Sequence, residues 1–338
     1  MADDRRVALP VGIATGIGSL PHVDPGEAVE FVLRHAPRLP FAPSLPARSK
    51  REGMVGQAAS GISGISVEAD GSLSIDHRAI DPDAPLDERS FAGDAFVGFR
   101  AFLTAMAERS GPIKISLTGP VTLGVALHAA GLRASSAFAV AGEAVRQRAR
   151  AMLRLVGERV PQAEVIAFVD EPSLALCTVP GFPIGPVDAV DLVSSALAVL
   201  EAGATTGLHC CGEADWRLLL QSGPQILSVP TGAGLERAAG TLADFLERGG
   251  WVAWGAVPTD RPVGQTVERL WRQLSVLWCD LVAGGCDPGL LRTRALITPA
   301  CGLARHGITQ AEQVMVLATR LAQRLHDQAI GVRLSVGA

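Results

Sequence analysis

The sequence predicts an α/β fold, a single (β/α)8 TIM barrel that spans residues 1–338 as one domain. Three observations predict it. Eight short apolar runs of strand length alternate with longer helix-like segments. Most of these runs are continuously apolar, which is typical of parallel strands covered on both faces. No Pro-, Gly- or Ser-rich linker, charge block or repeat divides the chain.

The predicted elements alternate from one end of the chain to the other. The predicted strands cover residues 11–19, 39–46, 113–119, 163–172, 205–211, 225–231, 251–257 and 292–299. Apolar residues at helical spacing fill most of the intervals between them. The predicted helices cover residues 25–35, 95–108, 136–160, 186–202, 235–248, 265–282 and 309–328.

The interval between the second and third predicted strands is longer than a barrel needs. Within it, residues 64–76 (GISVEADGSLSID) alternate on both sides of Asp70-Gly71, a pair typical of a tight hairpin turn. We therefore expect a β-hairpin inserted over one end of the barrel. The rival fold is an open doubly wound sheet, whose first strand leads into a Gly-rich phosphate loop. Pro21 and Pro25 interrupt the helix that would follow such a loop.

The composition excludes several classes of protein. A net charge of −4 and a pI near 6.0 lack the basic surface that nucleic acid or an anionic membrane requires. No apolar run reaches the ~20 residues that cross a bilayer, and the charged N-terminus is not a secretory signal. Six cysteines in 338 residues are too few for a disulfide-stapled module. We expect a cytoplasmic protein with no nucleic-acid or membrane partner.

Polar side chains end one predicted strand after another, where a barrel places its active site. The fifth strand ends in His209, Cys210 and Cys211, and Cys301 follows the eighth. Because side chains alternate along a strand, His209 and Cys211 share a face and Cys210 points to the other. Strands five and eight face each other across a closed barrel, so Cys301 can join that pair. An imidazole and two thiolates suit Zn2+; the alternative is that all of them are buried packing residues.

Six segments resemble the C-terminal catalytic barrel of cobalamin-independent methionine synthases, within the superfamily that also holds uroporphyrinogen decarboxylase. They are TGIGSLP (15–21), LPARSKREGM (45–54), SLTGPVTL (116–123), FVDEPSLA (168–175), LHCCG (208–212) and TPACGLA (298–304). The resemblance implies a zinc-dependent S-methyltransferase that methylates the thiol of homocysteine to give methionine. It also implies that His209, Cys211 and Cys301 are the zinc ligands.

The same resemblance assigns the residues that would hold the small-molecule thiol. The backbone and hydroxyl of Ile17, Gly18 and Ser19 would hold the carboxylate of the amino acid. Asp170 would pair with its ammonium group, and Glu52 is a second candidate for that role.

The chain departs from the family pattern near the metal and at the proton-transfer residue. The family's fourth zinc ligand is a glutamate at the end of strand six, and here no carboxylate occurs in that stretch before Glu236. Glu213, Glu171 or water would take its place, or the site has three protein ligands. The stretch after strand seven, WGAVPTD, lacks the family's catalytic histidine. Asp260 is the nearest group that could handle a proton there.

Further departures concern the methyl donor. Ala126 stands near the position where the family places a Trp that stacks on the pterin of methylfolate. We also expect no second barrel to help hold a polyglutamate tail. The residues that would hold the thiol acceptor are therefore kept. The methyl donor is either methylfolate or a corrinoid protein. A thiol other than homocysteine could also be the acceptor.

Two other functions remain open from the sequence. A uroporphyrinogen decarboxylase-like lyase would need several arginines near the first strands, where Arg48 and Arg51 are the candidates. The non-enzymatic alternative is a barrel that only binds a ligand or stores zinc.

Overall fold

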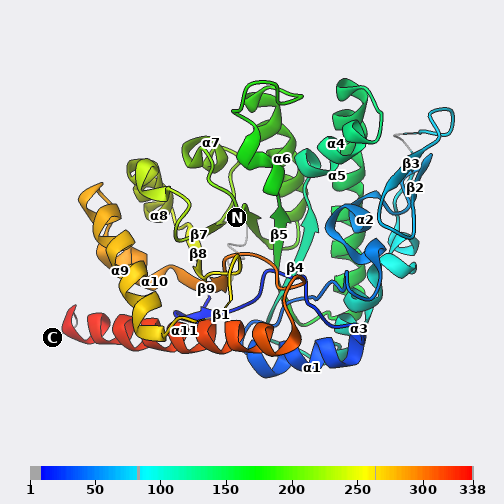
Figure 1. The fold of residues 1–338 in the computed structure, drawn as a ribbon. Helices are drawn as coiled ribbons and strands as arrows, with labels where there is room; N and C mark the ends of the chain where they lie inside the picture. Colours follow the sequence, from blue (N-terminus) through cyan, green and yellow to red (C-terminus); the bar gives the residue numbers. More distant parts are fainter. Residues whose placement is uncertain (1–8, 82–83, 263, 337–338) are drawn as a thin grey trace.

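A curled, parallel seven-stranded sheet forms the centre of the molecule (Figure 1), in a computed structural model that describes residues 9–81, 84–262 and 264–336. The strand order is β1-β9-β8-β7-β6-β5-β4. The strands are β1 (Ile13–Ala14), β4 (Pro112–Thr118), β5 (Glu164–Asp170), β6 (Thr205–His209), β7 (Ile226–Pro230), β8 (Trp251–Val257) and β9 (Ala295–Pro299). The parallel sheet confirms the α/β class.

The expected second strand, over 39–46, is not a regular strand. It occupies the gap between the two edges of the sheet, where Ser44 bridges to Ser19 of the segment after β1 and Phe41 bridges to Lys114 of β4. Its irregularity follows from three prolines, Pro40, Pro43 and Pro46. Because proline has no N–H group, it cannot donate a hydrogen bond to a neighbouring strand. Among the described residues, the central sheet therefore has seven regular strands, and residues 39–46 join its two edges only through these isolated bridges.

Helices cover the outside of the sheet (Figure 1). They are α1 (Pro25–His35), α2 (Met54–Ala59), α3 (Val97–Ala105), α4 (Pro120–Ala129), α5 (Ala134–Arg159), α6 (Pro186–Leu200), α7 (Trp216–Leu220), α8 (Ala239–Glu247), α9 (Val267–Ala283), α10 (Pro288–Thr293) and α11 (Ile308–Val336). The helices α2, α4, α7 and α10 lie where the sequence predicted none. In α4 and α10 the first residue is proline, whose missing N–H is not needed at a helix start.

The interval between residue 46 and β4 holds a small antiparallel pair. Strand β2 (Ile65–Val67) pairs with β3 (Leu73–Ile75) around Gly71, whose φ of 88° suits glycine in a tight turn. This pair lies beside α2, which precedes it in the chain (Figure 1).

Two apolar layers support the sheet. A small cluster that includes Ile13, Phe168 and Leu296 packs on its inner face. A much larger cluster packs between the strands and the helices, with Ile113 and Ile115 of β4 pointing into it. Because both faces are buried, the strand ends are where polar side chains can collect. Among the described residues, no helix is long and apolar enough to cross a membrane.

Candidate metal centre and its cavity

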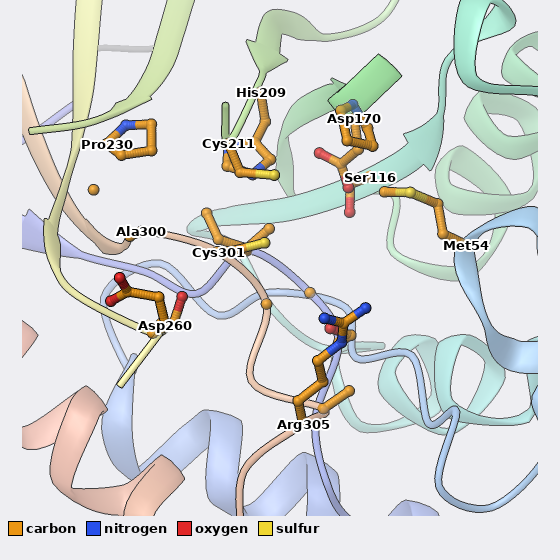
Figure 2. A pocket seen from close by; sticks show the side chains of 18 of the residues that line it. Met54, Ser116, Asp170, His209, Cys211, Pro230, Asp260, Ala300, Cys301 and Arg305 are labelled. Carbon is orange, nitrogen blue, oxygen red and sulfur yellow. The ribbon is translucent and has the colours of Figure 1, made fainter. Parts of the chain in front are cut away.

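A cavity of about 1210 Å3 opens at the carboxyl ends of the strands (Figure 2). Eight residues predicted for the site line it: Ile17, Gly18, Ser19, Asp170, His209, Cys211, Asp260 and Cys301. The ninth, Glu52, is not part of the lining. The fold thus brings together residues that are up to 284 positions apart in the sequence (17 and 301).

Three potential metal ligands converge in this cavity. One atom from each of His209, Cys211 and Cys301 can be chosen so that all three lie within 4.8 Å of one another. His209 ends β6 and Cys301 follows β9, and the two side chains meet across the mouth in Figure 2. Cys210 is fully buried in the outer apolar cluster, which confirms that it points away. The alternation of side chains along the strand accounts for this arrangement.

The imidazole of His209 is held by one nitrogen and free at the other. Its Nδ1 lies 2.9 Å from Oγ of Ser228, the residue beside it on β7. Its Nε2 is buried and, in the described part of the chain, has no hydrogen-bond partner. A buried polar atom without a partner is costly unless a ligand satisfies it. A histidine with one nitrogen hydrogen-bonded and the other free is the arrangement that metal-ligating histidines adopt.

The two thiols of the site perturb each other. A hydrogen bond from Cys211, supported by His209, lowers the pKa of Cys301, while the same hydrogen bond raises the pKa of Cys211. The two sulfur atoms therefore lie close enough together for each to shift the pKa of the other. Thiolate is the form of cysteine that binds a cation such as Zn2+.

Neither candidate for a fourth ligand belongs to this group. Glu171 is fully buried and accepts hydrogen bonds from the backbone N–H groups of Val121, at 2.7 Å, and Thr122, at 2.8 Å, at the start of α4. Burial raises the pKa of Glu171 to about 7. Glu213 is 65% exposed and pairs with Arg237. Three protein ligands leave one position open for a substrate.

Asp170 lies next to the three ligands, at the end of β5 (Figure 2). It is 8% exposed, and its Oδ1 has no hydrogen-bond partner among the described residues. Burial raises the pKa of Asp170, whereas Lys114 and His209 lower it. A buried acceptor oxygen without a partner, on a residue that lines the cavity, is suited to a positively charged group of a ligand.

The segment after β1 is tied to the segment after β9. The N–H of Leu303 donates to the carbonyl oxygen of Ser19 at 2.8 Å. A side chain on Gly302 would meet the Ser19 hydroxyl, which would have to turn away. The segment predicted to hold a carboxylate is thus tied to the residues that directly follow Cys301.

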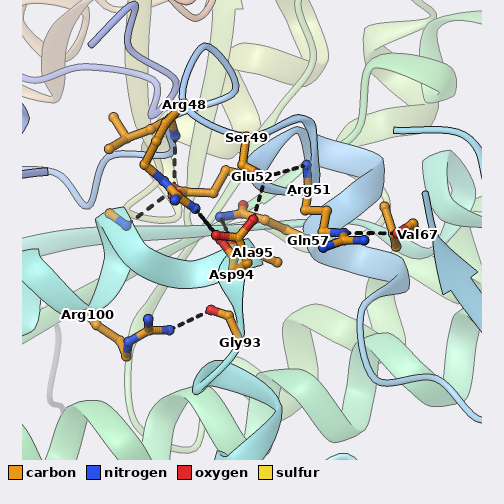
Figure 3. A network of polar contacts seen from close by, with 12 residues as sticks. Arg48, Ser49, Arg51, Glu52, Gln57, Val67, Gly93, Asp94, Ala95 and Arg100 are labelled. Atoms are coloured by element: carbon orange, nitrogen blue, oxygen red, sulfur yellow. Dashed lines mark hydrogen bonds and ion pairs between the residues drawn. The ribbon is translucent and has the colours of Figure 1, made fainter. Parts of the chain in front are cut away.

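Glu52 belongs to a network of polar contacts outside the cavity lining (Figure 3). Its carboxylate is fully buried, accepts from the N–H of Leu45 at 3.0 Å, and pairs with Arg48 at 2.7 Å. Arg48 in turn binds Asp94 at 2.7 Å. The structure therefore places Glu52 in a structural network instead of the cavity lining, contrary to our expectation. The arginines considered for a lyase, Arg48 and Arg51, also lie outside the lining.

Asp260 lies on the rim of the cavity, away from the three ligands (Figure 2). Its carboxylate is 68% exposed and forms hydrogen bonds of 2.9 and 3.0 Å with Arg261. The hydrogen bonds from Arg261 lower the pKa of Asp260. A carboxylate with a lowered pKa is ionised at neutral pH and is a weak base.

Sequence reasoning missed one wall of the cavity and one hydrogen-bond partner. An apolar wall includes Met54, Phe96, Phe99 and Met152, all outside the strand ends. They come from helices, whereas only residues at the ends of predicted strands were considered as site candidates. The sequence does indicate Ser228. It is a polar residue within an otherwise apolar strand, beside the strand that bears His209. Its hydroxyl could therefore form a hydrogen bond with the imidazole of His209.

Comparisons with known proteins give structural matches only. A scan of protein-family models and a search of curated proteins find no match. A methyltransferase from Methanosarcina mazei matches with a TM-score of 0.56 at 15% identity, over 92% of this chain and 94% of that one.

Two further solved structures are similar over most of their length. A B12-independent methionine synthase from Shewanella sp. W3-18-1, in complex with selenomethionine, has a TM-score of 0.57 at 14% identity, covering 95% of this chain and 99% of that one. A putative vitamin-B12 independent methionine synthase from Listeria monocytogenes has a TM-score of 0.52 at 13% identity, covering 90% and 85%. This chain therefore shares the fold of methionine synthase-like proteins and of a methyltransferase.

Proposed function

We propose that this protein is a zinc-dependent S-methyltransferase that transfers a methyl group to a thiol, with homocysteine as the acceptor. The observation that carries the proposal is the group formed by His209, Cys211 and Cys301, whose ligand atoms lie within 4.8 Å of one another. The fold shared with methionine synthase-like proteins supports it.

The donor set fits zinc. Zinc prefers nitrogen and sulfur ligands, and its catalytic sites combine three protein ligands with one open position. His209 would bind through Nε2, the buried nitrogen without a partner, while Ser228 holds Nδ1. When bound, zinc lowers the pKa of a thiol that enters the open position, so that the thiolate is present at neutral pH.

The residues beside the metal group fit an amino-acid acceptor. Asp170 would accept the ammonium group through its free Oδ1. The segment Ile17, Gly18 and Ser19 lines the cavity, is tied through Ser19 to the residues that follow Cys301, and would hold the carboxylate. These contacts would orient the thiol toward the open ligand position, because both ends of the amino acid are then fixed.

The cavity leaves room for a methyl donor beside the amino acid. We propose that a corrinoid carries the methyl group and that methylfolate serves poorly. Within the described residues, the cavity lining includes none from α4, the helix where the sequence resemblance implies an aromatic residue for the pterin and this chain has Ala126. A stacked aromatic contributes about 1–3 kcal/mol by analogy with nucleic-acid bases, and each 1.4 kcal/mol is tenfold in affinity.

Metal analysis followed by a methyl-transfer assay tests the proposal. The purified protein is expected to hold about one zinc ion per chain and to methylate homocysteine from methylcobalamin or a methylated corrinoid protein. The Cys211→Ser and Cys301→Ser variants should lose both properties, while Cys210→Ser, at the adjacent buried cysteine, should keep them. A zinc-loaded protein that transfers no methyl group from any donor would indicate a binding-only barrel. A protein that binds no zinc would contradict the proposal.

A further inference from the structure

Two arginines on one side of the cavity are not used by the proposed acceptor site. Arg272 lies on α9, Arg305 lies between β9 and α11, and both line the cavity. Figure 2 shows the guanidinium group of Arg305 directed into the cavity. Within the described ranges, neither side chain forms an ion pair or a hydrogen bond. The cavity lining therefore includes two positive charges with which no described residue pairs.

The backbone holds both arginines in place. Leu303, shortly before Arg305 in the chain, is buried, and its carbonyl oxygen accepts a 3.0 Å hydrogen bond from the N–H of His306. Arg272 lies on a helix that is anchored by buried residues such as Leu274. Helix α9 also packs against α11, so the two arginines lie on neighbouring parts of the fold (Figure 1).

The carboxylates of the cavity lining are engaged elsewhere. They are Asp170, Glu213 and Asp260. Glu213 pairs with Arg237, and Asp260 pairs with Arg261. Asp170 lies next to the metal group, where we propose that it receives the ammonium group of the acceptor (Figure 2). The basic side of the cavity is therefore available to an anionic group of a ligand, and a positive wall raises the local concentration of such a ligand.

The size of the cavity indicates which ligand carries that anionic group. A pocket of about 300–1,000 Å3 is enough for a drug-sized ligand, and this cavity measures about 1210 Å3. Homocysteine is much smaller, and both ends of its amino-acid group already have proposed partners near the metal group. The two arginines therefore match the second ligand, the methyl donor.

We propose that Arg272 and Arg305 form a binding site for a phosphate group of the methyl donor. This inference rests on the proposed function, which supplies the donor. Guanidinium groups from two elements can bind one tetrahedral phosphate from different directions, whereas a single guanidinium fork already matches both oxygens of a planar carboxylate. A corrinoid with an attached nucleotide carries one phosphate group, so the site fits the proposed donor.

Isothermal titration calorimetry with inorganic phosphate tests the site without any methyl transfer. The purified protein should bind phosphate with the same affinity, within about twofold, in the presence and absence of homocysteine, because the two ligands occupy different parts of the cavity. Arg272→Gln and Arg305→Gln should each weaken phosphate binding at least about tenfold, because each loses a hydrogen bond between charged groups. Glutarate, a dicarboxylate, should bind at least about fivefold more weakly than phosphate.

The matched control is Arg269→Gln. Arg269 is an exposed arginine on the same helix as Arg272, but it is not part of the cavity lining. Its replacement removes the same charge from α9 without removing a contact to the ligand. It should therefore change the affinity for phosphate less than about threefold.

Methyl transfer from two corrinoids distinguishes a phosphate of the donor from free phosphate. With methylcobalamin, Arg272→Gln and Arg305→Gln should each raise the KM for the donor about tenfold and leave the KM for homocysteine within about twofold of wild type. Methylcobinamide has the same corrin ring and methyl group but lacks the nucleotide and its phosphate. Its KM should respond to either substitution less than about twofold.

Several results would overturn the inference. A wild type that binds no phosphate, or an equal loss of affinity in Arg269→Gln, would show that the two arginines form no specific site. Displacement of phosphate by homocysteine would assign them to the carboxylate of the acceptor. Glutarate that binds as tightly as phosphate, or equal KM effects with both corrinoids, would contradict a site for the phosphate of the donor. If no donor supports methyl transfer, the proposed function fails, while the phosphate titration still decides whether Arg272 and Arg305 form an anion site.

Discussion

Replacing Ser228 by alanine should weaken zinc binding without removing a ligand. Ser228 is 1% exposed, and its hydroxyl lies 2.9 Å from Nδ1 of His209. In Ser228→Ala, the Nδ1–H of a zinc-bound His209 would be buried without an acceptor, which costs about 1–3 kcal/mol. At 1.4 kcal/mol per factor of ten, the loss in zinc affinity is about 5- to 150-fold. This agrees with the effect of removing other hydrogen-bond partners of metal-ligating histidines, about 10- to 100-fold.

Competition between the protein and a zinc chelator of known affinity measures this loss. The matched control is Ser222→Ala, because Ser222 is also buried, at 2% exposed, but its hydroxyl bonds to the carbonyl oxygen of Leu219. Ser222→Ala should keep the wild-type zinc affinity. If Ser228→Ala also binds zinc within about twofold of wild type, the hydrogen bond does not orient His209, and the reasoning about its free Nε2 is wrong.

Three further predictions concern single side chains. In chelator competition, Cys211→Ser and Cys301→Ser should bind zinc at least about 100-fold more weakly than Cys210→Ser, and equal losses would contradict the ligand set. Burial raises the pKa of Glu171 from 4.5 to about 7, so the folded state binds more protons in this range and stability falls as pH rises through it. Measured by urea unfolding, the free energy of unfolding of Glu171→Gln should therefore increase relative to wild type as the pH rises from 4.5 to 7, by up to about 3 kcal/mol. A difference that does not depend on pH would refute this. The third prediction concerns the proton-transfer role expected for Asp260. Because Asp260 is exposed and paired with Arg261, Asp260→Asn should lower kcat less than about tenfold. A loss above about 100-fold would assign Asp260 a catalytic role.

The sequence predicted the parallel strands better than the closure of the sheet. Apolar runs such as residues 251–257 coincide with strand β8, because a strand buried on both faces needs continuous apolar residues. The run at 39–46 is equally apolar but contains three prolines, which limit it to isolated bridges. Helix α4 was missed because its Gly-Pro start resembles a turn, although proline is also favoured in the first helical turn.

The convergence of the metal group could also be inferred from the sequence, since its residues lie at strand ends and their phase follows from alternation. Glu52 was misplaced because a charged residue in a single short helical turn gives no periodic signal of its direction. The fold buries it against backbone N–H groups near Leu45 and Gly98 instead.

X-ray absorption at the zinc edge tests the central claim most directly, because it counts the sulfur atoms bound to the metal. The zinc-loaded protein should show two sulfur ligands at ~2.3 Å, from Cys211 and Cys301, and nitrogen at ~2.0–2.1 Å from His209. Addition of homocysteine should increase the count to three sulfur atoms. A spectrum with two sulfur atoms both before and after addition, at homocysteine concentrations that saturate the protein, would contradict the claim that this site binds and activates a thiol.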